Sequence, residues 1–206
     1  MLLFKRFMVA YLRYAQKSII VLSFLLVGVL LVGCEDLTDE QSNELSYIQS
    51  VMLDSAVLDV DVTFEIDEDA SYIGAYARID KPVIRVTRGF INAYKSGKLS
   101  KNMVMFVIGH ELGHLGKVGK TKAGTMSGEI FADYWSILLL EEMQDAGVNV
   151  DIYDAIKFFY VIPHGVGAGD SLHPHPLDRY KYLKAKLDEW KSGKAYRAYA
   201  TKYATK

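Results

Sequence analysis

The most constraining feature of the sequence is the pentapeptide His-Glu-Leu-Gly-His at residues 110–114. Apolar residues recur at helical spacing before it, Ser100 stands where a helix N-cap is expected, and a glycine follows it. Residues four apart share one helix face, so His110 and His114 are placed to bind one metal ion. Glu111 lies one step round the helix, near that ion but not bound to it. The pattern is typical of zinc hydrolases, although two helix-face histidines beside an unrelated glutamate would give the same letters.

A second helix, expected over residues 127–145, offers a third ligand. Glu129 and Asp133 are four apart near its start, so they lie on one face of the helix. Glu129 would complete a zinc site of two histidines and one glutamate, with the fourth position open. Asp133 would accept a hydrogen bond from one of the ligand imidazoles. The alternative is a pair of solvated acids at a helix N-terminus, where the helix dipole favours them.

Three short strands are expected before the active-site helix. Apolar and polar residues alternate over 60–66, the period of a half-buried strand, and segments 72–79 and 83–87 are the next candidates. We expect a small antiparallel sheet. The candidate for an edge strand that pairs with an extended peptide substrate is the third one, made of Val83, Ile84, Arg85, Val86 and Thr87. The alternative is that this edge strand has a structural role only and binds no substrate. With further helices expected at 151–160 and 177–190, the chain predicts an α+β fold.

The last third of the chain contains three histidines in one loop. Residues 163–176 are too rich in glycine and proline for regular structure, and they include His164, His173 and His175. His164 and His175 are either further ligand candidates or plain surface residues. The amphipathic helix that follows would pack on the domain and position Arg179.

The first 34 residues resemble an export signal. Basic residues up to Lys17 precede an uncharged apolar run over 18–32, which is shorter than the roughly 20 residues that a stable membrane span requires. The run ends in Leu-Val-Gly before Cys34, which resembles the lipobox of bacterial lipoproteins, whose cysteine is lipidated. Cys34 is the only cysteine, so lipid attachment explains a residue that has no internal disulfide partner. An uncleaved signal anchor with an incidental cysteine is the alternative, and both place the domain outside the cytoplasm on a membrane surface.

Three motifs in the same order give the chain a specific resemblance. His-Glu-x-x-His at 110–114, Glu-x-x-Ala-Asp at 129–133 and His-Pro-x₄-Arg at 173–179 resemble the gluzincin peptidase family. That family contains HtpX, the type I CAAX prenyl protease and small periplasmic lipoprotein peptidases. The segment 83–90 also resembles the family's strand and turn before the active helix, and the resemblance covers about 45–190. It implies a minimal zincin-like fold, because the longer insertion that several relatives carry between the second histidine and the glutamate is absent.

The resemblance also implies roles for individual residues. It implies one Zn²⁺ per chain bound by His110, His114 and Glu129, with Glu111 as general base and Asp133 as the partner of a ligand. His173 and Arg179 then correspond to family residues at the active-site cleft, which steady the oxyanion or cap the metal.

The expected activity is that of a membrane-anchored zinc endopeptidase in envelope protein quality control. Its substrates would be unfolded or misassembled envelope proteins, and its domain would face the periplasm or the exterior. The alternative is a zinc-bound lipoprotein that acts as a binding or assembly factor, with His173 on the fourth coordination position. The 24 basic and 25 acidic residues give no sign of nucleic-acid binding.

The expected organisation has four parts. They are a lipoprotein signal peptide (1–33), an acidic tether (34–44), a zinc metallopeptidase domain (45–192) and a C-terminal tail (193–206). The polar segment after Cys34 has a second interpretation, as the start of a first helix that reaches to about Met52.

Overall fold

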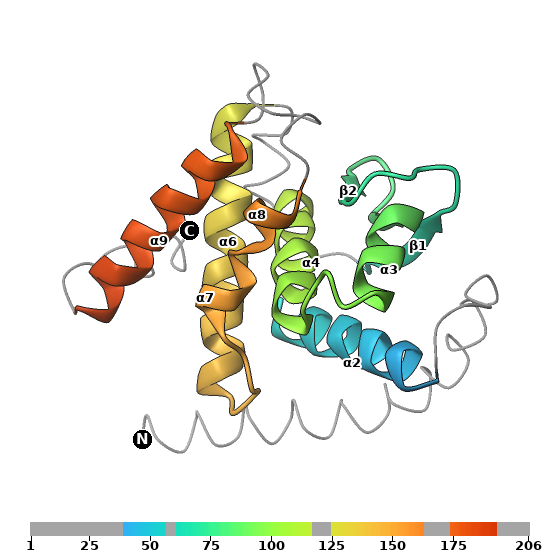
Figure 1. Cartoon of the computed structure of the whole chain (residues 1–206), viewed down its shortest axis with the longest axis horizontal. Helices are drawn as coiled ribbons and strands as arrows, with labels where there is room; N and C mark the ends of the chain where they lie inside the picture. Colours follow the sequence, from blue (N-terminus) through green and yellow to red (C-terminus); the bar gives the residue numbers. More distant parts are fainter. Residues whose placement is uncertain (1–38, 57–60, 117–124, 163–173, 193–206) are drawn as a thin grey trace. The chain divides into compact units, whose positions relative to one another are not determined.

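Helix α4 (Lys101–Leu115) carries residues 110–114 and lies at the centre of the domain (Figure 1). The Ser100 side chain caps it by accepting a hydrogen bond from the N–H of Met103 at 3.2 Å, as the sequence predicts. From Met103 onward nearly every side chain of the helix is buried. A helix that is buried on all sides is enclosed by the other elements, and these elements hold residues 110–114 in place.

The computed structural model describes residues 39–56, 61–116, 125–162 and 174–192. Besides α4, the elements in chain order are α2 (Asp39–Ser55), β1 (Thr63–Asp67), β2 (Ala75–Arg78), β3 (Val83–Thr87), α3 (Arg88–Lys95), α6 (Met126–Asp145), α7 (Ile152–Ala155), α8 (Phe158–Val161) and α9 (Pro176–Lys191). The domain is α+β, as predicted. None of the helices in these ranges has both the length and the apolar character needed to span a membrane. The predicted signal peptide, Cys34, His164, His173 and the C-terminal tail lie outside the described residues.

The sheet is mixed, which corrects the prediction of an antiparallel one. Its strand order is β1-β3-β2. Strand β1 runs parallel to β3, with Thr63 opposite Val83, whereas β2 runs antiparallel to β3, with Ala77 opposite Ile84. An alternating pattern identifies a strand but has the same period in both kinds of pairing, so it does not reveal strand direction.

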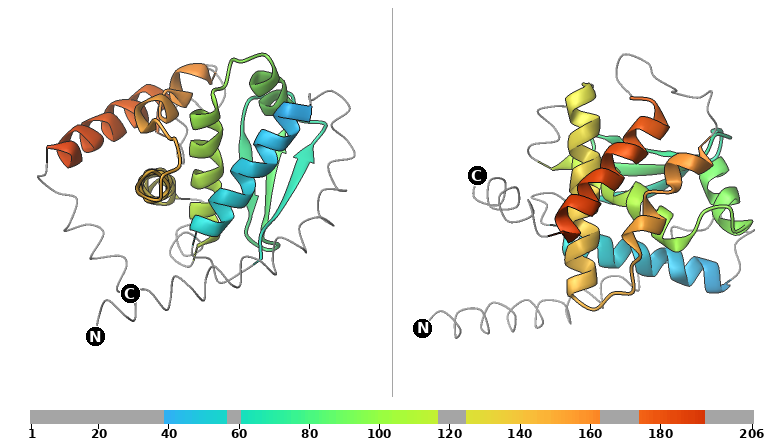
Figure 2. Two further views of the ribbon diagram at one scale, coloured as in Figure 1. Left: turned by 90° about the horizontal axis from the view of Figure 1, so that it is seen from below. Right: turned by 60° about the vertical axis from the view of Figure 1, so that its left-hand side comes forward.

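Strand β3 is the central strand, so its prediction as the substrate-binding edge is wrong. Both of its sides pair with neighbours, and its backbone groups are therefore not available to a peptide. Its burial agrees with a central position, since four of its five residues are buried. The terminal strand that packs against α4 is β2, and Figure 2 shows the sheet along one side of that helix.

Helix α6 packs closely against α4 because two glycines of α4 face it. A Cβ atom on Gly113 would lie 3.0 Å from the Cα of Ala132, and one on Gly109 would lie 2.7 Å from the Oγ of Ser136. The hydroxyl of Ser136 also donates a hydrogen bond to the carbonyl oxygen of Phe106 at 2.7 Å. This close contact brings the acidic start of α6 next to the histidines of α4.

The predicted helix over 151–160 is instead two short helices, α7 and α8. The backbone N–H groups of Lys157 and Tyr160 bond to carbonyls three residues back, which interrupts a continuous α-helix. The break lets three apolar side chains be buried together, namely Ile156, Phe158 and Phe159. Asp154 of α7 accepts a hydrogen bond from the hydroxyl of Ser100 at 2.5 Å, and this ties the pair of short helices to the start of α4.

Helix α2 begins at Asp39, so residues 39–44 are helical and do not belong to a tether. Within this stretch Glu44 accepts a hydrogen bond from the hydroxyl of Tyr94 in α3. The apolar face of α2 is buried through Leu45, Ile48 and Met52. The second interpretation of the polar segment, the start of a first helix, is correct for these residues.

Candidate active site

Three side chains bring their ligand atoms to one point between α4 and α6. The Nε2 atoms of His110 and His114 lie 3.1 Å apart. The Oε2 of Glu129 lies 3.3 Å from the Nε2 of His110, and the Oε1 of Glu129 lies 3.3 Å from the Nε2 of His114. A tetrahedral zinc ion with bonds of about 2.0–2.1 Å separates neighbouring ligand atoms by roughly 3.4 Å. The three side chains therefore fit a zinc ion without rearrangement, and they form the possible metal site of the described residues.

Asp133 fixes the orientation of His110. Its Oδ1 lies 2.9 Å from the Nδ1 of His110, and the Asp133 side chain is almost fully buried. The Nδ1 of the imidazole therefore carries the proton and donates it to the carboxylate. Metal-binding histidines commonly donate their second ring N–H in this way, and the bond leaves Nε2 free to face the metal position.

Arg179 of α9 holds Asp133 from the opposite side. Its Nε and Nη2 donate to the two carboxylate oxygens of Asp133 at 2.8 and 2.6 Å, and its Nη2 lies 3.8 Å from Glu129. The guanidinium also stacks over the ring of Phe159, 4.6 Å from its centre. Helix α9 is fixed in place by the apolar side chains of Leu183, Leu187 and Trp190. Two of the three guanidinium nitrogens of Arg179 are thus engaged by a carboxylate.

Comparison with known proteins assigns the family. Residues 39–140 match the sequence model described as Peptidase family M48, and this range contains the three clustered side chains and Asp133. The chain belongs to peptidase family M48. The predicted gluzincin family is therefore confirmed, and members of family M48 are zinc-dependent metallopeptidases. Neither the curated proteins nor the solved structures gave a significant match.

Oppositely charged side chains of the M48 site stabilise one another's charged forms. Burial acts to lower the pKa of His110, but hydrogen bonds to Asp133 and Glu129 outweigh it and raise that pKa to about 9. Burial acts to raise the pKa of Glu129, yet hydrogen bonds from His110 and His114 hold it well below its usual range. Burial is likewise outweighed at Asp133, whose pKa is lowered by Arg179 and His110. Both acids are therefore anions at neutral pH, as a cation site requires.

Glu111 is buried beside the ligand cluster, and its environment differs from that of the other two acids. Burial raises the pKa of Glu111 above its usual value, although the neighbouring His110 and His114 act to lower it. The backbone N–H of Ala77 in β2 donates a hydrogen bond to the Glu111 carboxylate. A carboxylate with a raised pKa next to a metal position suits a residue that both takes up and releases a proton. The contact with Ala77 also places strand β2 directly beside that carboxylate.

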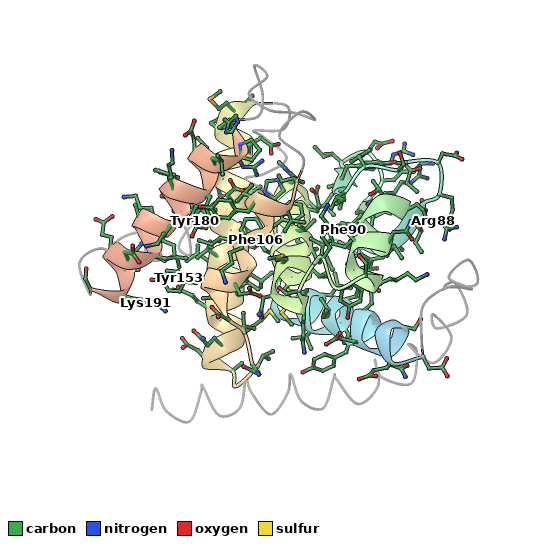
Figure 3. All side chains as sticks on the ribbon, in the orientation of Figure 1. Arg88, Phe90, Phe106, Tyr153, Tyr180 and Lys191 are labelled. Atoms are coloured by element: carbon green, nitrogen blue, oxygen red, sulfur yellow. The ribbon has the colours of Figure 1, made fainter. Side chains whose placement is uncertain are left out.

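A cavity of about 360 Å³ opens onto the cluster. One part of its wall is polar and includes His110, Glu111, Glu129 and Arg179. Another part is apolar and includes Phe106, Val107, Phe158, Phe159 and Ile162. In Figure 3 Phe106 lies between α4 and α8, where its ring meets that of Phe159 edge to face at a centre distance of 5.4 Å. Residues 72–76, including the start of β2, complete the wall together with Pro174 and Pro176.

Three residues of the site region have positions that the sequence did not predict. The Nδ1 of His175 accepts a hydrogen bond from the N–H of Leu177 at 3.3 Å, so His175 caps α9. No sequence pattern singled out Ala77, which the fold places beside Glu111, or Tyr72, which it places at the cavity. Neither had a signal, because Ala77 acts through its backbone and Tyr72 is one of 14 tyrosines.

Proposed function

We propose that this metallopeptidase is a zinc-dependent endopeptidase that cleaves unfolded or misassembled proteins of the cell envelope. The triangle of His110, His114 and Glu129, with its ligand atoms 3.1 to 3.3 Å apart, is the observation that carries the proposal. Glu111 and the edge strand β2 face the same cavity as this triangle.

The three ligands would hold one zinc ion per chain. Zinc in such a site supplies Lewis-acid chemistry, polarising the scissile carbonyl and making a water molecule acidic. Asp133 keeps His110 in the tautomer that presents Nε2 to the metal position, and Arg179 keeps Asp133 ionised and aligned. Arg179 therefore acts as a positioning residue, through Asp133.

Glu111 transfers the proton in this mechanism. Its carboxylate accepts the proton of the attacking water and then delivers it to the amine nitrogen that leaves. The raised pKa of Glu111 makes the protonated form easier to reach, which an acid–base shuttle requires. His173, which the family resemblance places at the cleft, is proposed to help steady the oxyanion that develops on the peptide.

Strand β2 is the proposed binding edge for the substrate. It pairs with β3 on one side only, and among the described strands it is the one that ends the sheet beside α4. A peptide added along the outer edge of β2 would pass Glu111, which already accepts a hydrogen bond from Ala77 of this strand. Backbone pairing aligns an extended chain without requiring a particular sequence, so it suits unfolded polypeptides.

The N-terminal segment supports a location at the cell envelope. Its basic residues, apolar run and Cys34 have the order of a lipoprotein signal. We propose that the mature protein is anchored by lipid on Cys34 and that its catalytic domain faces the periplasm or exterior.

The activity is tested with zinc-loaded protein that starts just after Cys34. Casein, which is unfolded, and a folded protein of similar size are incubated with it, and the products are analysed by mass spectrometry. We expect internal cleavage of casein, little cleavage of the folded protein, loss of activity with a chelator and recovery with zinc. Bound zinc without any cleavage would instead support the alternative of a binding or assembly factor.

A further inference from the structure

The segment before β2 is held to the start of α3 by a buried hydroxyl. The side chain of Thr87 is fully buried and lies within hydrogen-bond distance of the carbonyl oxygens of Tyr72 and Gly74, at 3.0 Å from the latter. The backbone N–H of Thr87 donates to the same Gly74 oxygen at 3.0 Å. The same hydroxyl accepts the N–H of Phe90 and so caps α3. One buried threonine thus fixes both the helix and the segment.

A glycine lets the same segment approach the helix closely. The N–H of Gly89 donates to the carbonyl oxygen of Ala70 at 3.2 Å. A Cβ atom on Gly89 would lie 2.1 Å from the carbonyl oxygen of Ser71, closer than any side chain permits. Residues 70–74 are therefore fixed before any substrate binds.

The ring of Tyr72 lies over a second glycine and faces the cavity. A Cβ atom on Gly74 would lie 3.0 Å from the Cε2 of Tyr72, so glycine at this position leaves room for the ring. Tyr72 lines the same cavity as His110 and Glu111, and it is 42% exposed. Burial raises the pKa of its phenol, and Tyr76, Asp67 and Glu111 raise it further. The phenol therefore keeps its proton at neutral pH.

Some hydrogen-bond donors of the cavity wall already donate to a neighbouring carboxylate, whereas another does not. The hydroxyl of Tyr76 donates to Asp67 at 2.7 Å, and Arg179 is held by two hydrogen bonds to Asp133. Within the described part of the chain, the hydroxyl of Tyr72 makes no hydrogen bond. It is a hydrogen-bond donor at the cavity, on a segment held by Thr87 and Gly89, and no described residue accepts from it.

We propose that Tyr72 is a further catalytic residue, whose phenol O–H donates a hydrogen bond to the oxyanion that develops on the scissile carbonyl of a peptide bound along β2. The assignment rests on the proposed peptidase function. A donor held in place before the reaction stabilises developing charge without first having to reorganise, and removing one such donor lowers kcat by about 10²–10³-fold.

The test compares Tyr72→Phe with wild type and with Tyr160→Phe. Both substitutions remove a single hydroxyl from an exposed tyrosine, but Tyr160 lies on α8 outside the cavity wall and contacts Tyr180. Zinc per chain, kcat and KM on a fluorogenic peptide, and the affinity for a phosphinic peptide that mimics the tetrahedral oxyanion are measured for each protein.

We expect Tyr72→Phe to bind as much zinc per chain as wild type and to have the same KM. Its kcat should fall by about 100-fold, and it should bind the phosphinic peptide at least about tenfold more weakly. Tyr160→Phe should match wild type in every measurement. A wild-type kcat in Tyr72→Phe, or a rise in KM alone, would overturn the role of Tyr72 while leaving the peptidase function standing. If wild type itself binds zinc but cleaves no peptide, the proposed function fails and the role of Tyr72 fails with it.

Discussion

Arg179 and Asp133 form a two-point ion pair, at 2.8 and 2.6 Å, that joins helix α9 to the metal-site helix α6 behind His110. The M48 match ends at residue 140, so Arg179 lies beyond it. Helix α9 is nevertheless part of the site, because its Arg179 holds the Asp133 carboxylate that orients His110.

Arg179→Ala should weaken zinc binding by about 10–100-fold, because partners that orient a metal ligand typically contribute that much. The substitution leaves the buried Asp133 charge without its main partner, which also lowers stability by roughly 3–5 kcal/mol. Zinc affinity is measured by competition with a chromophoric chelator, and stability by denaturant unfolding. Lys184→Ala is the control, since its exposed pair with Asp188 lies on the same helix. Equal zinc affinity in Arg179→Ala and wild type would refute the positioning role.

Gly113→Ala should destabilise the domain and weaken the metal site together. The added methyl group would lie 3.0 Å from the Cα of Ala132 and 3.2 Å from the Cβ of Trp135, and a backbone atom cannot move aside by rotation of a side chain. We expect a loss of about 1–3 kcal/mol from overpacking, although alanine favours helices by roughly 1 kcal/mol over glycine. Thermal unfolding and zinc content measure the two effects, and an increase in Tm would show that α6 does not approach α4 this closely.

The stability of the metal-free protein should fall as the pH rises from about 6.5 to 9. The pKa of His110 is raised from 6.5 to about 9 in the fold, so the protonated imidazole stabilises the fold. That contribution is complete below pH 6.5 and is lost as the pH passes through 9, and it is on the order of 3 kcal/mol. Chelator-treated protein is unfolded with denaturant across this range. The His110→Gln variant should show a much flatter profile, and an equally steep one would assign the dependence to other groups.

Glu44→Ala should lower the free energy of unfolding by about 1–2 kcal/mol. The substitution removes the hydrogen bond from Tyr94 that ties α2 to α3. Glu40→Ala is the matched control, because Glu40 is an exposed acid one turn earlier on the same helix. If the two variants are equally stable, the contact with Tyr94 does not hold α2 in place.

The sequence predicts the metal-site helices well because their signals are local. Helical spacing, the Ser100 cap and the following glycine define α4, and Glu129 is recognisable by its spacing from Asp133 and by its place after the histidine motif. These features depend on neighbours in the chain, which a sequence displays directly.

The sheet and the cavity wall depend on contacts between distant segments, and there the predictions fail. No local pattern shows that β1 lies parallel to β3 or that β2 is the edge next to Glu111. The break at Lys157 likewise follows from burying Phe158 and Phe159 on the domain, whereas the sequence there is compatible with one continuous helix. The hydrogen-bond contact of the Thr87 hydroxyl with the carbonyl oxygens of Tyr72 and Gly74 has no signal in the sequence either.

The most direct test of the proposed peptidase mechanism is a side-by-side measurement of zinc content and casein cleavage for wild type and Glu111→Gln. The substitution keeps the size of the side chain and spares the proposed ligands His110, His114 and Glu129, but it removes the proposed proton acceptor. We expect one zinc per chain in both proteins, and a cleavage rate in the variant that is lower than in wild type by about 10²–10⁴-fold. Equal cleavage by the two proteins would contradict the assignment of Glu111 as the base.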